Sequence, residues 1–120
     1  MHELSIAQSI VEMVQQHVPP SNWDHVVAVR LKVGTLSGVV PDSLEFSFQA
    51  ITSDTPFRHA RLEIETIPFR VQCNACQATT VSEGGFAACS QCGSIETKVL
   101  SGSELHISEI ELEEPEEKKP

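Results

Sequence analysis

Apolar residues recur at steps of three and four along residues 4–18, which is the spacing of one face of a helix. Pro19 and Pro20 follow directly, and proline cannot continue a helix because it lacks a backbone N–H group. The pattern therefore predicts an amphipathic helix that ends before Pro19. Its expected buried stripe contains Leu4, Ala7, Ile10, Val11, Val14 and Val18.

Three later segments have the alternating pattern of half-buried strands. Residues 103–112 change phase near Ser108, which indicates a strand with a bulge. The other two segments alternate without a break. In residues 25–33 one face contains Val27, Val29, Leu31 and Val33, and in residues 60–67 one face contains Leu62, Ile64 and Thr66.

A second helix is expected between the first two strands. Leu44, Phe48 and Ile51 have helical spacing, and Asp42 has the side chain typical of an N-cap. Two helices packed on a three-stranded sheet make a small α/β (α+β-like) domain.

The order of the segments also predicts the domain organisation. We expect a discontinuous α/β domain of residues 1–68 and 102–114, interrupted by a metal-binding domain of residues 69–101. Residues 115–120 are charged and contain proline, so we expect a disordered acidic tail there.

The charge balance excludes several classes of partner. The chain has 120 residues, with 17 acidic and 8 basic side chains and a formal net charge of −9. Nucleic acids and anionic membranes both attract basic surfaces, so we expect this protein to bind neither. No apolar run is long enough to span a bilayer, and the N-terminus lacks the features of a signal peptide. We therefore expect a cytoplasmic protein.

Four cysteines give the strongest chemical signal. Cys73 and Cys76 form one C-x-x-C pair, Cys89 and Cys92 form another, and two glycines lie midway, where a hairpin would reverse direction. In a reducing compartment such pairs hold a metal more often than they form disulfides. Four sulfur ligands suit tetrahedral Zn²⁺ and leave no open position, so the predicted zinc is structural. The alternatives are iron in a rubredoxin-like cage and unligated or redox-active cysteines.

The first three residues, Met-His-Glu, give a weaker signal. The Met1 amine and the His2 amide and imidazole nitrogens can form fused chelate rings around one ion. The fourth donor would be the Glu3 amide nitrogen or the Glu3 carboxylate. Such nitrogen-rich coordination suits Ni²⁺ or Cu²⁺. On residue chemistry alone, a terminal histidine is more often a solvated polar residue, and Glu3 more often an acid that the helix dipole favours.

In combination these motifs resemble one protein family. The opening MHELSIAQSIVEMV, the stretch VRLKVGTLSGVVPDSLEFSF, and CNAC…CSQCG followed by LHISEIEL are similar to the HypA/HybF family of hydrogenase nickel-incorporation factors. The similarity extends over residues 1 to about 112. It implies a metallochaperone and not an enzyme. Its Ni²⁺ cargo would bind at His2 and Glu3, and the four cysteines would hold zinc.

The resemblance also implies partners. Members of this family act with a HypB-type GTPase, they supply nickel to the precursor of the [NiFe]-hydrogenase large subunit, and some serve urease maturation. The residues themselves leave two other classes open. One is a zinc-ribbon adaptor that binds proteins without transferring nickel. The other is a small metalloenzyme, although the chain lacks an evident enclosed acid–base constellation.

Overall fold

The computed structural model describes residues 3–82 and 87–113. The chain divides into two compact units. The domain limits expected from the sequence stay a prediction, because compactness alone does not show which part folds independently. Unit 1 contains Met1–Leu31, Val40–Ile64 and Ile107–Pro120, and unit 2 contains Lys32–Val39 and Glu65–His106.

Helix α1 (Glu3–His17) ends before Pro19, as predicted. Its buried face is not quite the expected stripe, because Leu4 is 47% exposed and Val11 is only half-buried. Apolar residues occupy more than one side of this helix, and spacing alone does not decide which side packs against the rest of the unit. The buried side chains are Ile6, Ala7, Ile10 and Val14.

A short 3-10 helix, η1 (Pro20–His25), follows α1 and was not expected from the sequence. The indole Nε1 of Trp23 donates a hydrogen bond to the carbonyl oxygen of Val18 at 2.8 Å. This carbonyl lies just past the end of α1, where carbonyl groups lack intrahelical partners. The Trp23 ring also lies 5.4 Å from the Phe57 ring, measured between centroids. One aromatic side chain therefore fixes the segment after α1.

Helix α2 (Pro41–Thr52) packs against α1 within unit 1. The expectation that Asp42 is its N-cap was wrong. The N-cap is Val40, which has no side-chain acceptor, and Pro41 is the first helical residue. Proline favours this position because its φ is already helical and its missing N–H would be unpaired there anyway. The buried side chains of α2 are Leu44, Phe48 and Thr52.

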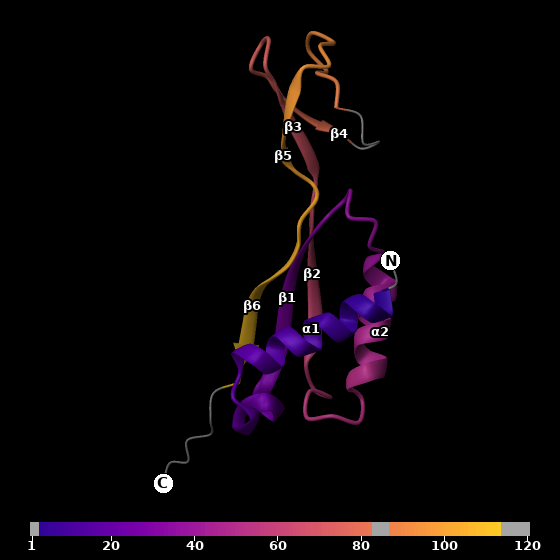
Figure 1. The fold of residues 1–120 in the computed structure, drawn as a ribbon, viewed down its shortest axis with the longest axis vertical. Coiled ribbons are helices and arrows are strands. Elements are labelled where there is room, and N and C mark those ends of the chain that lie inside the picture. The colour runs from indigo at the N-terminus through magenta and orange to yellow at the C-terminus, as the bar shows by residue number, and fades with distance from the viewer. Residues whose placement is uncertain (1–2, 83–86, 114–120) are drawn as a thin grey trace. The chain divides into compact units, whose positions relative to one another are not determined.

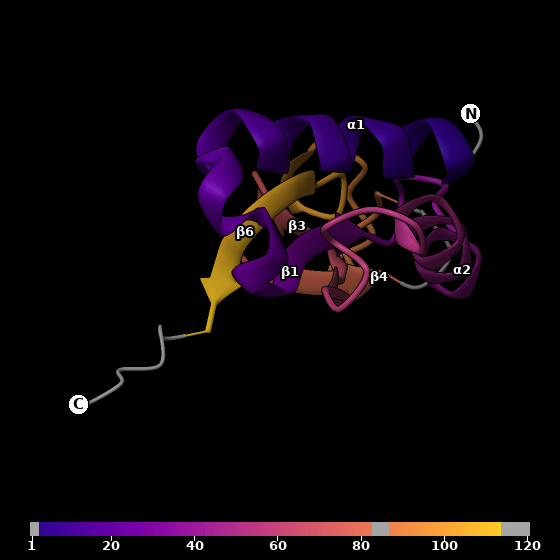
Figure 2. The ribbon, with the colours of Figure 1, turned by 90° about the horizontal axis from the view of Figure 1, so that it is seen from below.

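The first sheet has the strand order β2-β1-β6 (Figure 1). Its strands are β1 (Val26–Gly34), β2 (Arg61–Ile67) and β6 (Leu105–Leu112). Figure 2 shows α1 lying along one face of β1 and β6. The predicted class, two helices on a three-stranded sheet with a four-cysteine insertion, is confirmed.

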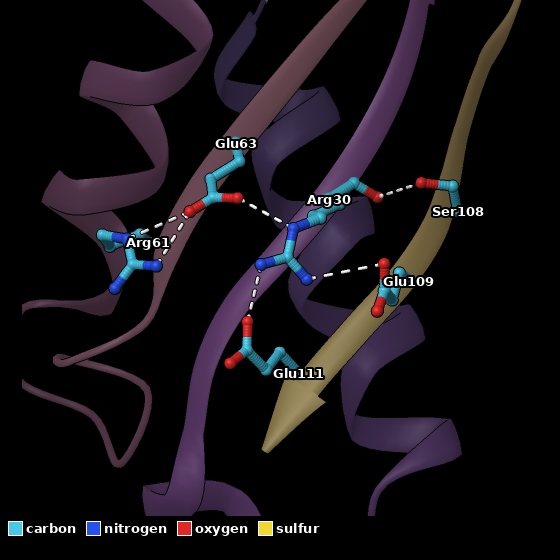
Figure 3. A network of polar contacts seen from close by, with 6 residues as sticks. All are labelled: Arg30, Arg61, Glu63, Ser108, Glu109 and Glu111. Atoms are coloured by element: carbon cyan, nitrogen blue, oxygen red, sulfur yellow. Dashed lines mark hydrogen bonds and ion pairs between the residues drawn. The ribbon is translucent and has the colours of Figure 1, made fainter. Parts of the chain in front are cut away.

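One guanidinium group connects all three strands of this sheet (Figure 3). Arg30 on β1 donates to Glu63 on β2 at 2.8 Å and to Glu111 on β6 at 2.6 Å, and it lies 3.5 Å from Glu109. Arg61 also donates to Glu63, at 2.8 Å. Hydrogen bonds from Arg61 and then Arg30 lower the pKa of Glu63 below its ordinary value. The charged residues that alternate along these strands thus form a connected network.

The second sheet belongs to unit 2 and has the order β4-β3-β5, with antiparallel pairing throughout. Its strands are β3 (Phe69–Cys73), β4 (Thr79–Ser82) and β5 (Thr97–Ser101). The sequence predicted a metal-binding segment here but not these strands, which are too short to show a clear alternation. The hairpin expected at residues 84–85 lies outside the described residues.

Two glycines allow a close approach of backbone segments within unit 2. The Gly34 N–H donates to the carbonyl of Glu104 at 2.7 Å, and the Leu36 N–H donates to the carbonyl of Gly102 at 2.8 Å. A Cβ on Gly34 would overlap the backbone of Gly102. Gly102 itself has φ +125°, and a Cβ there would lie 2.7 Å from the Cα of Phe69. Side chains larger than hydrogen are excluded at both positions.

Candidate metal sites

The four cysteine sulfur atoms converge in unit 2, where all four lie within 4.8 Å of one another. The Sγ atoms of Cys73 and Cys92 are 3.5 Å apart, and those of Cys76 and Cys89 are 3.6 Å apart. All four are free thiols, with Cys73 and Cys89 buried and the other two exposed. The structure thus brings together the side chains that the two C-x-x-C motifs singled out.

The two C-x-x-C loops have the same backbone geometry. The N–H groups two and three residues after the first cysteine donate to its sulfur, at 3.3 and 3.4 Å for Cys73 and at 3.3 and 3.5 Å for Cys89. Each loop closes on a residue in the left-handed region, Gln77 with φ 69° and Gly93 with φ 78°. The N–H groups of these residues donate to the carbonyls of Cys73 and Cys89 at 3.0 and 2.9 Å. Sequence reasoning missed Gln77, because nothing in its side chain marks a left-handed conformation.

Backbone donors lower the pKa of the first thiol in each loop. The N–H groups of the second loop, that of Cys92 first, lower the pKa of Cys89 to about 6. The N–H of Cys76 likewise lowers the pKa of Cys73. For Cys92 the backbone N–H of Ser94 acts in the same direction, but the neighbouring thiols, Cys73 first, outweigh it and raise the pKa to about 11. Four adjacent sulfurs therefore cannot all ionise readily without a cation among them.

The cage fits a tetrahedral metal ion. Zinc–sulfur bonds of about 2.3 Å place the sulfur atoms of a regular tetrahedron about 3.8 Å apart. The observed separations of 3.5 and 3.6 Å are close to this value. Thiolate ligands suit zinc or iron and not the hard cations magnesium and calcium. Within the part of the chain that the structure describes, the four cysteines form the one cluster of three or more metal-capable side chains.

The N-terminal motif is described from Glu3 onward, and Met1 and His2 lie outside the described residues. Glu3 is half-buried in the first turn of α1, and its Oε2 accepts a hydrogen bond from the N–H of Val40 at 3.1 Å. Glu3 thereby joins the start of α1 to the start of α2. An open hollow of about 460 Å³ lies beside it, lined by Glu3, Leu4, Asp42, Ser43, Phe46 and Ser47.

The sequence matches the model of a protein family over nearly its whole length. The family model described as "Hydrogenase/urease nickel incorporation, metallochaperone, hypA" matches residues 1–112. This chain belongs to the HypA family. HypA proteins are maturation factors that act in nickel incorporation, so the chain is a metallochaperone and not an enzyme.

Individual HypA relatives match nearly the whole chain. "Hydrogenase maturation factor HypA" of Geobacter metallireducens is 44% identical over 113 residues, which are 94% of this chain and 100% of that protein. The protein of the same name from Desulfatibacillum aliphaticivorans is 41% identical over 120 residues, which are 99% of this chain and 92% of that protein. The family expected from the sequence is therefore confirmed.

The fold also matches solved HypA structures. "Solution structure of the Ni metallochaperone HypA from Helicobacter pylori" superposes with a TM-score of 0.62 and covers 93% of this chain and 97% of that one. The two sequences are 18% identical, so this likeness concerns the fold alone. None of the helices in the described residues has the length and apolar character needed to cross a membrane.

Proposed function

We propose that this HypA-family chain carries Ni²⁺ at its N-terminus and holds Zn²⁺ permanently in the four-cysteine cage. The observation that carries the proposal is the cage itself. Four converging sulfur donors complete a tetrahedral sphere, which leaves no position where a second ion could be loaded and released. A nickel-incorporation factor therefore needs another site for its cargo. The residues Met1, His2 and Glu3 supply one.

The nickel donors are the Met1 amine, the amide and imidazole nitrogens of His2, and one donor of Glu3. Fused chelate rings and nitrogen donors suit Ni²⁺. The amide nitrogens bind after losing their protons to the solvent, and the imidazole binds in its neutral form. Nickel binding therefore weakens as the pH falls through the imidazole range.

The zinc ligands are Cys73, Cys76, Cys89 and Cys92. In the proposal, residues 69–101 fold around this ion as a domain inserted into the nickel-binding domain of residues 1–68 and 102–114. Residues 115–120 form a tail outside both. The proposal includes a cytoplasmic location, because a reducing compartment keeps the four thiols unpaired and available for metal.

The proposed recipient of the nickel is the precursor of the [NiFe]-hydrogenase large subunit, with a HypB-type GTPase as the partner in transfer. The names of the relatives, which refer to hydrogenase maturation, support a hydrogenase as the recipient. The GTPase is proposed from the family resemblance. Urease maturation is a second destination, supported by the description of the family.

A different function, that of a zinc-ribbon adaptor without nickel transfer, is favoured by one observation. Ile95 and Val99 in unit 2 are 82% and 54% exposed, and exposed apolar side chains commonly mark contacts with other proteins. The adaptor and the metallochaperone differ in whether the N-terminus binds nickel.

The deciding experiment is a nickel titration of untagged protein with a free α-amine, together with metal analysis. We expect His2→Ala to lose specific nickel binding while keeping its zinc and its circular dichroism spectrum. His106→Ala is the matched control, because His106 is exposed on β6 and lies in no metal cluster among the described residues. Equal nickel binding by the wild type and His2→Ala would overturn the nickel site and favour the adaptor.

A further inference from the structure

The first C-x-x-C loop, which carries Cys73 and Cys76, is built into the second sheet. Cys73 is the last residue of β3, and its N–H donates to the carbonyl of Ala78 at 2.9 Å, where the chain turns back into β4. On the other side, the N–H of Asn74 donates to the carbonyl of Glu96 at 2.9 Å, just before β5. Backbone hydrogen bonds on both sides therefore fix the position of this loop.

The second C-x-x-C loop, residues 89–93, has no such support from the sheet. The N–H groups of Cys89 and Gly93 donate to the carbonyls of Ser94 and Cys89, both at 2.9 Å. The N–H groups of Gln91 and Cys92 point to the sulfur of Cys89. Among the described residues, this loop makes no backbone–backbone hydrogen bond to a strand of the sheet. Side chains must then connect it to the sheet.

Two threonine side chains of the sheet make this connection. Oγ1 of Thr80 on β4 accepts the N–H of Ser90 at 3.1 Å and lies 3.1 Å from the hydroxyl oxygen of Ser90. The hydroxyl of Thr97 on β5 donates to the carbonyl of Ala87. One contact is made before Cys89 and the other directly after it. The two threonines therefore hold the chain on both sides of one proposed zinc ligand.

Both threonines lie on the face of the sheet that carries Cys73. Thr80 is paired with Val71, and Thr97 is paired with Cys73. Paired residues, and residues two apart on one strand, have their side chains on the same face. Thr80 and Thr97 are half-buried on this face. The side on which they meet the second loop is thus the side on which the sulfurs of Cys73 and Cys92 approach to 3.5 Å.

We propose that Thr80 is a positioning residue for zinc: its hydroxyl holds the second loop against the sheet, so that Cys89 and Cys92 stay at the ion. Thr80 is the stronger of the two candidates because it makes two contacts with the residue next to a ligand. A second loop that moves away from the sheet would take two sulfur ligands with it. The Thr80 contacts therefore slow the release of the ion. This inference rests on the proposed zinc function of the cage.

Valine tests this role, because it has the shape of threonine and suits a strand but has no hydroxyl group. Zinc transfer to a chromogenic chelator is measured for the zinc-loaded full-length wild type, Thr80→Val and Thr80→Ser. We expect release from Thr80→Val to be about tenfold faster, the factor for one hydrogen bond of ordinary strength. Thr80→Ser keeps the hydroxyl and should stay within about threefold of the wild type, a margin well inside that factor.

Thr79→Val is the matched control. Thr79 is exposed on the same strand, points to the opposite face, and its hydroxyl makes no hydrogen bond among the described residues. The substitution is the same chemical change without the contact to the second loop. It should release zinc at the wild-type rate.

Two further readouts distinguish positioning from a general loss of stability. The absorption spectrum of the cobalt-substituted proteins should be the same for all variants, since four sulfur ligands remain. In Thr80→Val the Ser90 amide proton should exchange with solvent faster than in the wild type, while exchange at Val71 in the central strand stays unchanged. Faster exchange at both positions would show that the substitution weakens the whole sheet and would overturn the inference.

The possible failures are distinguishable. Equal release from the wild type and Thr80→Val, or equally fast release from Thr80→Ser and Thr80→Val, would overturn the inference. If Thr80→Val does not fold, the wild type decides: slow exchange of the Ser90 amide proton supports the contact, and exchange as fast as in an unstructured peptide overturns it. If metal analysis finds that the wild type does not hold zinc, the proposed zinc function itself fails, and the inference fails with it.

Discussion

The two units of this protein are stabilised by different means. Unit 1 buries large apolar side chains from its helices and its strands, among them Leu31, Leu44 and Phe48. Among the described residues of unit 2, the buried apolar side chains other than the two cysteines are Val33, Phe69 and Val71. Burial of apolar area, at about 25 cal/mol per Å², is the main favourable term in folding, so unit 2 lacks most of what stabilises unit 1.

Unit 2 compensates with its four-cysteine cage. Its strands have only four or five residues each, and several of its apolar side chains, including Val81, Ile95 and Leu100, are exposed. Small units without a sufficient core usually need a disulfide or a metal. With the proposed zinc bound, the four-cysteine cage would take the place of a larger core in unit 2, whereas unit 1 has the buried apolar side chains that a core needs.

Loss of one cage ligand should give the largest effect. We expect Cys89→Ser to lose zinc and to unfold unit 2, because structural zinc supplies the folding free energy that the few buried side chains cannot. Unit 1 should stay folded. Zinc analysis and amide NMR dispersion, followed at Val71 in unit 2 and Phe48 in unit 1, check this.

Gln91→Ala is the control for this substitution. Gln91 lies in the same loop and uses its backbone N–H, not its side chain, to contact the Cys89 sulfur. It should keep zinc and both sets of signals. Native dispersion of unit 2 in zinc-free Cys89→Ser would contradict the view that metal replaces the core.

A core truncation tests unit 1 in the same way. Phe48 is 1% exposed, and Phe46 on the same helix is 72% exposed. We expect Phe48→Ala to lower the free energy of unfolding of unit 1 by about 3–5 kcal/mol through lost burial and a cavity. Phe46→Ala should change it by less than about 0.5 kcal/mol. Urea unfolding measures both, and similar losses for the two variants would show that unit 1 does not depend on this core.

The two cysteine loops allow a smaller test within unit 2. Gln77 and Gly93 hold equivalent left-handed positions, which cost a side-chain residue about 1 kcal/mol or more relative to glycine. We expect Gln77→Gly to stabilise the zinc-loaded protein by ~0.5–1 kcal/mol and Gly93→Ala to destabilise it by about 1 kcal/mol. Denaturant unfolding with zinc present measures both changes in the free energy of unfolding, which should have opposite signs. The same sign for both would mean that the loops are not equivalent.

The smallest effect should come from the ion-pair network of unit 1. The pKa of Glu63 is lowered in the folded state, first by Arg61 and then by Arg30, so its ionised form stabilises the fold. That contribution is complete above the ordinary pKa of 4.5 and is lost as the pH falls through the lower, folded pKa. We expect Glu63→Gln to lower the melting temperature slightly at pH 7 and to match the wild type in acid.

Glu65→Gln is the control for this pH profile. Glu65 is exposed on the same strand and makes no ion pair among the described residues. Its substitution should leave the difference between pH 7 and acid unchanged. A Glu63→Gln deficit that persists at acid pH would show that packing, and not charge, accounts for the effect.

The sequence predicted those features that repeat at a fixed spacing. The end of α1 at the proline pair, the helical spacing of Leu44 and Phe48, and the alternation along β1 from Val29 to Val33 all follow from local periodicity and were found in the structure. The alternation fails at the start of β1, where Ala28 is buried and Val27 only half-buried. The two C-x-x-C motifs likewise singled out the four thiols that converge in unit 2. Periodicity and spacing are local properties, and a single sequence shows them directly.

Other features cannot be predicted from local patterns in the sequence. The side of α1 that is buried, the aromatic contact that fixes η1 and the brief strands β4 and β5 depend on what each segment meets in the fold. Asp42 has a side chain suited to an N-cap, but the N-cap is Val40, two residues earlier, and Asp42 lies inside the first turn of α2.

The amino-acid sequence by itself determined which chemical groups are present: four cysteines in two C-x-x-C pairs, a histidine at the second position, and an excess of acidic side chains. Only the tertiary structure decided how these groups are held. It brought Glu3 to the N–H of Val40, Arg30 to acids on both neighbouring strands, and Gln77 into a left-handed turn. The contacts of Glu3 and Arg30 join residues that lie far apart in the chain, and the turn at Gln77 depends on its backbone conformation. Neither kind of feature produces a periodic pattern in the sequence.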